Sequence, residues 1–507
     1  MHTFSTLAEL LSAGADAEPA LRAPGAAALS YAALRDNVLH TVAALNGMGI
    51  GRGDRVAIVL PNGPEMAAAF VSVAACSTSA PLNPAYRADE FGFYLSDLHA
   101  KALIVEHGSQ SPAIAVAQRL GVRILELTPA GHGAGAFTLN EPAGGSAATA
   151  ARPGFAEAGD IALILHTSGT TSRPKIVPLS QTNVCASATN VRNTLQLKAG
   201  DCGLNIMPLF HIHGLIAGLL APLSAGSSIF CSPGFNALKF FGWMSEAKPT
   251  WYTAVPTMHQ AILSRASHGR DVISANPLRF MRSSSSSMPP QVIAELEQVF
   301  GAPLVEAYGM TEAAHQMASN PLPPGKRIPG TVGLAAGPDV AIMDTEGRLL
   351  APGETGEIVI RGRNVTAGYE NNPKANAEAF THGWFRTGDQ GTKDAEGYVR
   401  ITGRLKEIIS RGGEKISPRE VDEILMDHPA VQQVVTFGIP HDKLGEEVGA
   451  VIVLREGTSA TEKELRDFAA IRLADFKVPR KILFLEEIPK GATGKLQRIG
   501  LAAKLGL

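Results

Sequence analysis

Short apolar runs rich in valine and isoleucine alternate with helix-like segments through the first third of the chain. These runs cover residues 55–60, 102–105 and 161–165. Buried parallel strands give this pattern, and residues 64–75, which open with Pro64, are typical of a helix packed through its alanines. The alternation of strands and helices predicts an α/β architecture. The stretch 127–158, rich in alanine, glycine and proline, is expected to be a surface connection ahead of the third strand.

Beyond residue 333 the pattern changes to short strands separated by glycine turns. Strands are expected at 339–344, 357–361 and 398–401, and this spacing favours antiparallel hairpins. After residues 404–406 strands and helices alternate again, with helices expected at 418–426 and 461–473 and strands at 431–438 and 449–454. We therefore predict an N-terminal domain over 1–403, a hinge at 404–406 and a small C-terminal domain over 407–507.

Composition limits the partners that the 507-residue chain can bind. Lys and Arg number 45 against 47 Asp and Glu, a formal net charge of −2, so there is no broad positive field for nucleic acid or an anionic membrane. The four cysteines form no C-x-x-C pair, which favours reduced, buried side chains. No signal peptide is recognisable, and no apolar stretch reaches the roughly 20 residues that cross a bilayer. We expect a cytoplasmic protein that binds small molecules, without an obligate protein partner.

A loop rich in glycine and hydroxyl residues follows the strand at 161–165. It reads Thr-Ser-Gly-Thr-Thr-Ser-Arg-Pro-Lys over residues 167–175. Backbone N–H groups and hydroxyls of such a loop bind phosphate oxygens, and the lysine adds a positive charge. The Walker A spacing is absent, and a plain surface linker is the alternative. The candidate phosphate-binding residues are Thr167, Ser168, Gly169, Thr170, Thr171 and Lys175.

A second group of candidates lies in the segment Glu-Ala-Tyr-Gly-Met-Thr-Glu at 306–312. A carboxylate such as Glu312 beside phosphates suits Mg²⁺, and Tyr308 offers a flat face to a purine. Taken alone, a glutamate in a turn is more often a plain surface residue. Further along, Asp389 could accept hydrogen bonds from ribose hydroxyls, and Arg404 lies in the sequence Gly-Arg-Leu-Lys.

The order and separation of these motifs resemble the acyl-adenylate-forming ligases over nearly the whole chain. The series comprises the loop at 167–175, Pro-Leu-Phe-His at 208–211, Tyr-Gly-Met-Thr-Glu at 308–312, Thr-Gly-Asp at 387–389, Gly-Arg-Leu-Lys at 403–406 and Gly-Lys at 494–495. The resemblance implies an α/β fold: a large N-terminal body of fused α/β subdomains with a small β-barrel-like part, and a small mobile C-terminal α+β domain.

The resemblance also implies a two-step reaction. A carboxylate attacks the α-phosphorus of ATP to give an acyl-adenylate and pyrophosphate, and coenzyme A then displaces AMP to give a thioester. Because a carboxylate is already ionised near pH 7, the first step needs charge neutralisation rather than a base. By analogy, the loop would wrap the phosphates, Thr167 and Glu312 would lie nearest Mg²⁺, and Thr311 would contact the α-phosphate. The remaining nucleotide contacts would come from Glu306, Ala307 and Tyr308 at the adenine and from Asp389 and Arg404 at the ribose.

Residues near the C-terminus match positions that act in catalysis and domain movement in these ligases. Lys495 matches the lysine that bridges the carboxylate and the α-phosphate. Lys406 matches the pivot of the domain rotation that precedes the second step. The loop at 411–415 would then admit the pantetheine arm of coenzyme A, with Gly412 and Gly413 keeping the thiol tunnel clear. Lys415 would touch phosphate in one of the two conformations.

The predicted acyl pocket is more polar than that of ligases for long-chain or aromatic acids. A serine run occupies 283–287, and the segments at 208–214, 251–257, 306–315, 319–323 and 411–418 resemble the oxalate–CoA ligases of plants and fungi. Their equivalents of His211, His213, Ser284, Ser285 and His315 would cradle the dicarboxylate, and a protonated histidine could pair with a second carboxylate. The chain departs from that family in having Gly309 where alanine is common, and it lacks a terminal Ser-Lys-Leu.

Two other functions remain open from the sequence. A ligase for medium-chain or other small acids would share every ATP motif, because polar pocket residues can face water instead of substrate. An adenylation enzyme that loads a carrier protein belongs to a different class, and no carrier-domain attachment region is recognisable here. The presence of both Glu312 and Lys495 favours a catalytically active protein.

Overall fold

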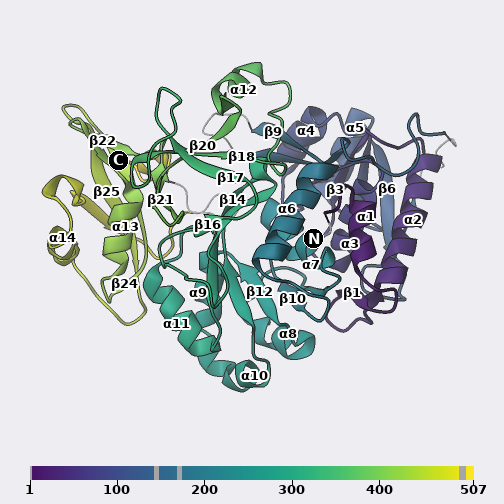
Figure 1. Cartoon of the computed structure of the whole chain (residues 1–507), viewed down its shortest axis with the longest axis horizontal. Coiled ribbons are helices and arrows are strands. Elements are labelled where there is room, and N and C mark those ends of the chain that lie inside the picture. The colour runs from purple at the N-terminus through teal and green to yellow at the C-terminus, as the bar shows by residue number, and fades with distance from the viewer. Residues whose placement is uncertain (1–2, 142–147, 168–173, 490–497) are drawn as a thin grey trace.

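The computed structural model describes residues 3–141, 148–167, 174–489 and 498–507. Within these ranges the strands form four β-sheets (Figure 1). No helix in the described ranges combines the length and the apolar composition that crossing a membrane would require.

The first sheet has seven strands in the order β7-β6-β5-β3-β4-β8-β9. Neighbouring strands from β6 to β8 run parallel, and β7 and β9 are antiparallel at the two edges. The three strands predicted in this region and the helix from Pro64 are confirmed. The strands are β3 (Arg55–Val59), β4 (Thr78–Pro81), β5 (Ala102–Glu106), β6 (Arg123–Pro129), β7 (Phe137–Asn140), β8 (Ile161–Thr167) and β9 (Lys175–Ser180).

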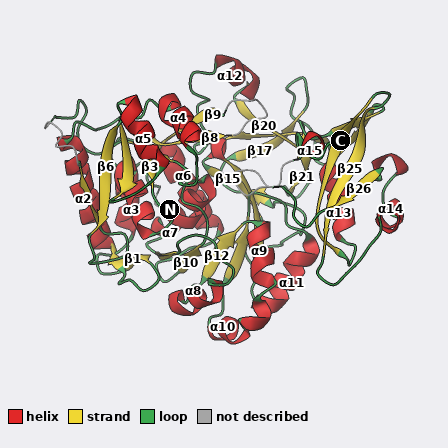
Figure 2. Cartoon of the chain, turned by 180° about the vertical axis from the view of Figure 1, so that it is seen from behind, coloured by secondary structure: helices red, strands yellow, loops and turns green. Residues whose placement is uncertain are grey.

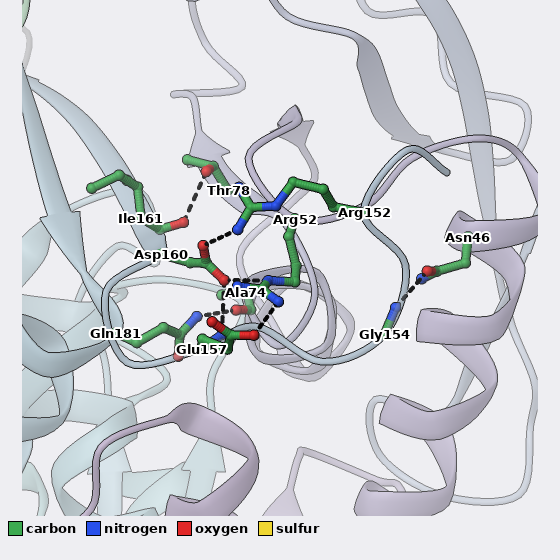
Figure 3. A network of polar contacts seen from close by, with 10 residues as sticks. All are labelled: Asn46, Arg52, Ala74, Thr78, Arg152, Gly154, Glu157, Asp160, Ile161 and Gln181. Carbon is green, nitrogen blue, oxygen red and sulfur yellow. Dashed lines mark hydrogen bonds and ion pairs between the residues drawn. The ribbon is translucent and has the colours of Figure 1, made fainter. Parts of the chain in front are cut away.

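The expectation of a surface connection over 127–158 is wrong in part. Strand β7 pairs with β6 at the edge of the sheet, so a short strand lies within this glycine- and alanine-rich stretch. Polar contacts hold the end of the stretch 127–158 and the residues that follow it (Figure 3). Arg52 Nε lies 2.6 Å from Asp160 Oδ2, and Arg152 Nη2 lies 3.0 Å from Asp160 Oδ1. Thr78 Oγ1 also donates to the carbonyl oxygen of Ile161 at 2.8 Å. These contacts anchor the beginning of β8, whose other end carries Thr167.

The second sheet has nine strands in the order β16-β15-β14-β13-β12-β10-β11-β1-β2. The central strands β11, β10, β12, β13 and β14 run parallel, and β15 turns back antiparallel to β14. Its strands are β1 (Pro19–Arg22), β2 (Leu29–Ser30), β10 (Cys202–Asn205), β11 (Ser228–Cys231), β12 (Trp251–Ala254), β13 (Phe280–Ser283), β14 (Leu304–Met310), β15 (His315–Ser319) and β16 (Leu334–Ala335).

The predicted β-barrel-like part is a five-stranded antiparallel sheet. Antiparallel hairpins join three of the four pairs of successive strands, as the glycine turns predicted, whereas the second strand pairs with the fourth and not with the third. The strands are β17 (Asp339–Met343), β18 (Thr355–Arg361), β19 (Phe380–Thr381), β20 (Trp384–Lys393) and β21 (Val399–Arg404).

The fourth sheet lies wholly after residue 408, and its elements gather at one end of the molecule (yellow in Figure 1), opposite α2 and α3. The expected helices and strands of this region are confirmed. The strands are β22 (Ile409–Arg411), β23 (Glu414–Ile416), β24 (Val431–His441), β25 (Gly445–Leu454) and β26 (Lys481–Phe484). The boundary predicted at 404–406 coincides with the end of β21, and the division into two domains stays a prediction.

Helices pack around the two large sheets, and α12 (Pro373–Ala379) lies beside the five-stranded sheet (Figure 2). Several begin on proline, which lacks the N–H that the first helical position leaves unpaired. They are α1 (Leu7–Leu10), α2 (Tyr31–Gly47), α3 (Pro64–Ala74), α4 (Ala88–Asp97), α5 (Pro112–Leu120), α6 (Gln181–Thr194), α7 (Ala221–Leu223), α8 (Phe240–Ala247), α9 (Pro256–Leu263), α10 (Arg270–Ala275), α11 (Pro290–Phe300), α12 (Pro373–Ala379), α13 (Pro418–Met426), α14 (Glu462–Ala470) and α15 (Leu501–Lys504). Shorter or wider turns form η1 (Leu11–Ala13), η2 (His213–Leu220, a π-helix), η3 (Ala266–His268), η4 (Thr311–Ala313) and η5 (Asp475–Lys477).

Candidate active site

The candidate residues converge at the carboxyl ends of the parallel strands in the nine-stranded sheet. The segments that follow β10, β13 and β14 contribute His213, Ser285 and Glu312, and β15 begins with His315. Ligands of open α/β sheets bind at this edge, because the loops after neighbouring parallel strands meet there. The topology therefore brings four positions from the range 213–315 into one region.

Three of the predicted acyl-pocket residues are in contact. The rings of His213 and His315 are stacked with centroids 4.8 Å apart, and His213 Nδ1 lies 3.1 Å from Ser285 Oγ. His213 Nε2 is also 2.7 Å from Oγ1 of Thr253 on β12. Both histidines are buried. The pattern of hydrogen-bonding side chains predicted from the sequence thus forms one polar cluster.

Arg282 joins this cluster, and sequence reasoning used it only as a landmark. Its guanidinium donates from Nη1 to His213 Nε2 at 3.3 Å and from Nη2 to His315 Nε2 at 3.0 Å. Arg282 is fully buried and makes no ion pair with a carboxylate in the described part of the chain. Burial lowers the pKa of Arg282 to about 9, which leaves the side chain positively charged at neutral pH. A charged residue inside a buried strand was the signal that could have identified it.

The contacts of Arg282 favour neutral rings over the protonated histidine that the sequence left possible. An arginine side chain has no acceptor, so both Nε2 atoms must accept the hydrogen bonds from Arg282. Each ring is then neutral, and the positive charge resides on the guanidinium.

The backbone around this cluster is unusual. Ser285 and His315 have φ angles of 74° and 100°, values that favour glycine over residues with side chains. Backbone strain of this kind tends to gather at functional sites. At Gly309 an added Cβ would lie 1.7 Å from the carbonyl oxygen of His315, so this arrangement requires the glycine that departs from the oxalate–CoA ligase pattern.

The two other predicted pocket residues lie at the borders of the cluster. Ser284 is buried, and its hydroxyl donates to the carbonyl oxygen of Ala307 at 3.0 Å, which ties the end of β13 to β14. His211 precedes η2, where its carbonyl accepts from Leu215 N at 3.0 Å and its ring lies 4.7 Å from that of Phe210. Ser284 therefore holds two neighbouring strands together beside the cluster.

The residues predicted to bind adenosine meet across three strands. The Tyr308 hydroxyl on β14 donates to Asp389 Oδ2 on β20, and Arg404 Nε on β21 lies 3.2 Å from Asp389 Oδ1. Asp389 and Arg404 are also direct cross-strand partners. Burial raises the pKa of the Tyr308 hydroxyl well above its usual range, so this group stays a donor.

Glu312 is connected to the phosphate-loop lysine through a residue that the sequence did not single out. The Tyr369 hydroxyl donates to Glu312 Oε1 at 2.8 Å, and Lys175 Nζ lies 4.3 Å from the centre of the Tyr369 ring. Thr167 is the cross-strand partner of Lys175. Burial raises the pKa of the Glu312 carboxyl, and the hydrogen bond from Tyr369 opposes that change. No sequence pattern marked Tyr369, because its role depends on contacts between distant segments.

The rest of the segment at 306–312 surrounds β14 and its end. Glu306 is buried, accepts from Gly330 N at 3.3 Å, and has a pKa raised by burial to about 8. Ala307 is buried beside it, and Thr311 begins η4 directly after the strand. Contact of these residues with a nucleotide stays a prediction.

The predicted hinge residue and the two tunnel glycines lie in turns, and Lys415 lies on strand β23. Lys406 is in the turn after β21, where Leu405 N donates to the carbonyl of Gly388 at 2.9 Å. Gly412 and Gly413 form the two-residue turn between β22 and β23 with φ angles of 59° and 95°, which favours glycine at both positions. Lys415 Nζ donates to Ser410 Oγ at 2.6 Å.

Five of the predicted residues lie outside the described ranges. They are Ser168, Gly169, Thr170 and Thr171 of the phosphate loop and the catalytic candidate Lys495.

Comparison with known families identifies two matching segments. The family described as "AMP-binding enzyme" matches residues 12–370, and the "AMP-binding enzyme C-terminal domain" matches residues 420–495.

Individual relatives match along almost the whole chain. A Humulus lupulus protein named "Probable CoA ligase CCL9" is 46% identical over 476 residues, which is 93% of this chain and 90% of that protein. An oxalate–CoA ligase of Arabidopsis thaliana is 44% identical over 502 residues, covering 98% of this chain and 97% of the relative. The crystal structure of ATP-bound MatB from Rhodopseudomonas palustris matches with a TM-score of 0.88 and 29% identity, covering 99% and 98% of the two chains.

Proposed function

Because this chain belongs to the AMP-binding enzyme family, we propose that it is an AMP-forming ligase that joins oxalate, a small dianionic acid, to coenzyme A. In the first step one oxalate oxygen bonds to the α-phosphorus of ATP, and the bond to pyrophosphate breaks. In the second step the sulfur of coenzyme A bonds to the acyl carbon, AMP leaves with the electron pair of the broken C–O bond, and the thiol proton is released. The relative named an oxalate–CoA ligase, at 44% identity, supports this assignment.

The observation that carries the proposal is the buried positive charge of Arg282. An unpaired charge in a protein interior is costly, and an anionic ligand would offset that cost. The neighbouring side chains of His213, Ser285 and His315 make the surroundings of this charge polar. An alkyl chain in the same space would leave the buried charge without an anion and the Ser285 hydroxyl hydrogen without an acceptor, at about 1–3 kcal/mol for such a polar group. The pocket therefore suits a small acid whose second end is also anionic.

The nucleotide would lie between this pocket and the third sheet. Tyr308, Asp389 and Arg404 would hold adenosine, and Lys175 would contact the phosphates that the loop at 167–175 wraps. In the structure both Asp389 oxygens already have partners, in Tyr308 and Arg404. Binding of a ribose would thus require Asp389 to accept additional hydrogen bonds, which the several lone pairs of a carboxylate allow.

The residues present suit Mg²⁺ delivered with ATP. Mg²⁺ is commonly held by one or two protein oxygens together with substrate phosphates and water. Thr167 Oγ1 is buried and has no hydrogen-bond partner among the described residues, and Glu312 supplies a buried carboxylate. No group of three or more His, Cys, Asp or Glu side chains in the described ranges forms a metal site by itself. Bound there, the ion would neutralise charge on the phosphate oxygens.

Catalysis of the first step would depend on charge neutralisation and alignment. Lys495 would bridge the acid and the α-phosphate, Thr311 would contact the α-phosphate, and the positive charge of Arg282 would favour the distal carboxylate. For the second step we propose that the C-terminal domain rotates about Lys406 and brings the turn of Gly412, Gly413 and Lys415 to the pantetheine arm.

A panel of acids tests the proposed function. The purified protein is mixed with ATP, Mg²⁺, coenzyme A and either oxalate, malonate, acetate or hexanoate, and AMP and thioester are measured. We expect the highest kcat/KM with oxalate and weak activity with hexanoate. Faster turnover of hexanoate than of oxalate would overturn the assignment and favour a ligase for medium-chain acids.

A histidine variant tests the location of the acid. His315→Ala is expected to raise KM for oxalate about tenfold or more, because it removes one polar group of the pocket, while KM for ATP changes little. His132→Ala is the matched control. This histidine is exposed, and the contact of its Nδ1 is local, with the carbonyl oxygen of Ala130 at 3.0 Å. Full oxalate activity in His315→Ala would refute the placement of the acid beside this histidine.

A further inference from the structure

Arg282 occupies a position between two imidazole rings that determines where their protons lie. Its Nη1 and Nη2 groups donate to Nε2 of His213 and of His315, at 3.3 and 3.0 Å. Because these nitrogens accept, the proton of each neutral ring must be on Nδ1. One guanidinium thus constrains both histidines in the same way.

The contacts of His213 agree with this assignment of protons. Its Nδ1 lies 3.1 Å from Ser285 Oγ and is therefore the donor of that hydrogen bond. The Ser285 oxygen accepts this proton, so the hydroxyl hydrogen of Ser285 is left to donate elsewhere. On the other side of the ring, Thr253 Oγ1 accepts from Arg282 Nη1 at 3.4 Å and lies 2.7 Å from Nε2, so its own hydroxyl hydrogen can point at the same nitrogen.

The position of Arg282 is itself supported from behind. Gln316 Oε1 accepts from Nη2 at 3.3 Å, and the Gln316 amide nitrogen donates to Thr194 Oγ1 at 3.0 Å, which orients the amide. His259 Nε2 lies 3.1 Å from the carbonyl oxygen of Arg282, and Tyr252 donates to the other ring nitrogen at 3.0 Å. These buried contacts fix β13 and hold the guanidinium between the two rings.

We propose that Arg282 is a positioning and specificity residue that locks His213 and His315 as neutral rings with the proton on Nδ1. The lock gives the pocket a defined polarity: one positive charge on the guanidinium, and a donor at the Ser285 hydroxyl. A second cation on either ring would lie about 3 Å from the guanidinium in a buried site, which like-charge repulsion disfavours. The statement about the acid rests on the proposed function, whereas the statement about the protons stands without it.

The wild-type protein alone tests the positions of the protons. Nitrogen-15 NMR of histidine-labelled protein distinguishes Nδ1–H rings, Nε2–H rings and imidazolium rings, and the signals are assigned with His213→Gln and His315→Gln. We expect two Nδ1–H rings that stay neutral at pH 6. An imidazolium or an Nε2–H ring at either position would overturn the proposal, whether or not the protein activates oxalate.

Two variants of Arg282 test its effect on specificity. Arg282→Met removes the charge and the donors, and Arg282→Lys keeps only the charge. We expect Arg282→Met to raise KM for oxalate about 100-fold with KM for ATP nearly unchanged, and to let the two rings exchange between tautomers. Arg282→Lys is expected to recover part of the oxalate affinity. Its two histidine rings should be a mixture of tautomers, unlike the single Nδ1–H form expected in the wild type.

The outcomes separate the two proposals. If both rings are neutral with the proton on Nδ1 but the protein does not activate oxalate, the proposed function is refuted and the tautomer lock is supported. Loss of oxalate activity in Arg282→Met with both rings unchanged would support the function and overturn the lock. Circular dichroism and a thermal melt show whether each variant is folded, and the wild-type spectrum decides the proton positions if a variant is not.

Discussion

Replacing Tyr369 by phenylalanine would isolate one hydrogen bond on the ATP side of the site. The Tyr369 hydroxyl donates to Glu312 Oε1 at 2.8 Å, while its ring lies 4.3 Å from Lys175 Nζ. Tyr369→Phe removes the first contact and keeps the second. A hydrogen bond to a buried charged group contributes about 1.5–3 kcal/mol. This one favours the ionised carboxylate, which is the form that would bind Mg²⁺.

This free energy corresponds to a rise of roughly 10- to 100-fold in KM for Mg-ATP. Burial raises the pKa of Glu312, and the hydrogen bond from Tyr369 lowers it, so the variant should have a still higher pKa at this carboxyl. The acid limb of the pH profile for adenylation should therefore move to higher pH, and the defect should shrink as pH rises. Pyrophosphate release is measured against Mg-ATP concentration at several pH values with saturating oxalate.

Tyr398→Phe is the matched control for this measurement. Tyr398 also donates its hydroxyl, to the carbonyl oxygen of Lys326 at 2.6 Å, and the Lys326 ammonium lies 5.9 Å from its ring centre. It is not among the candidate site residues, so KM for Mg-ATP should stay at the wild-type value. A folded Tyr369→Phe protein with the same KM and the same acid limb as wild type would refute the role of Tyr369 in supporting Glu312.

Three further predictions concern other parts of the chain. Lys495→Ala should slow adenylation about 100-fold or more and affect thioester formation from supplied oxalyl-adenylate much less; equal losses in the two half-reactions would contradict its role. Lys406→Pro should block thioester formation while pyrophosphate release persists, and unchanged overall turnover would count against the hinge. Burial raises the pKa of Glu306 from 4.5 to about 8, so the folded state keeps a proton that the unfolded chain releases. Stability should therefore fall between about pH 4.5 and 8, by up to about 1.4 kcal/mol per pH unit. Glu306→Gln should flatten this dependence in urea unfolding, and identical slopes would disprove it.

Much of the fold could be predicted because its signals are local. The apolar run of β3, the proline that opens α13 and the glycines that separate the strands of the third sheet each report on neighbouring residues. The strand β7 was missed because its four residues lie in a stretch rich in alanine and glycine, where pairing with β6 decides the conformation. Intrinsic strand preference is too weak to mark such an edge.

The candidate site was predictable only in part, for a related reason. His213, Ser285 and His315 were found through a resemblance to known motifs, and the structure brings them into contact. Arg282 and Tyr369 were missed because each matters through what surrounds it. Arg282 binds the two histidines, and Tyr369 joins Glu312 to Lys175 across segments that are far apart in the sequence.

By itself, the sequence determined the family and predicted the positions of the nucleotide contacts, since motif spacing and strand patterns depend on the order of residues along the chain. Only the tertiary structure decided the charge and polarity of the acid pocket. Thr253, Arg282 and His315 lie on separate strands, and their side chains meet only when those strands align. Whether a buried histidine is neutral or charged depends on the groups within a few ångströms of its ring, and those groups come from the fold.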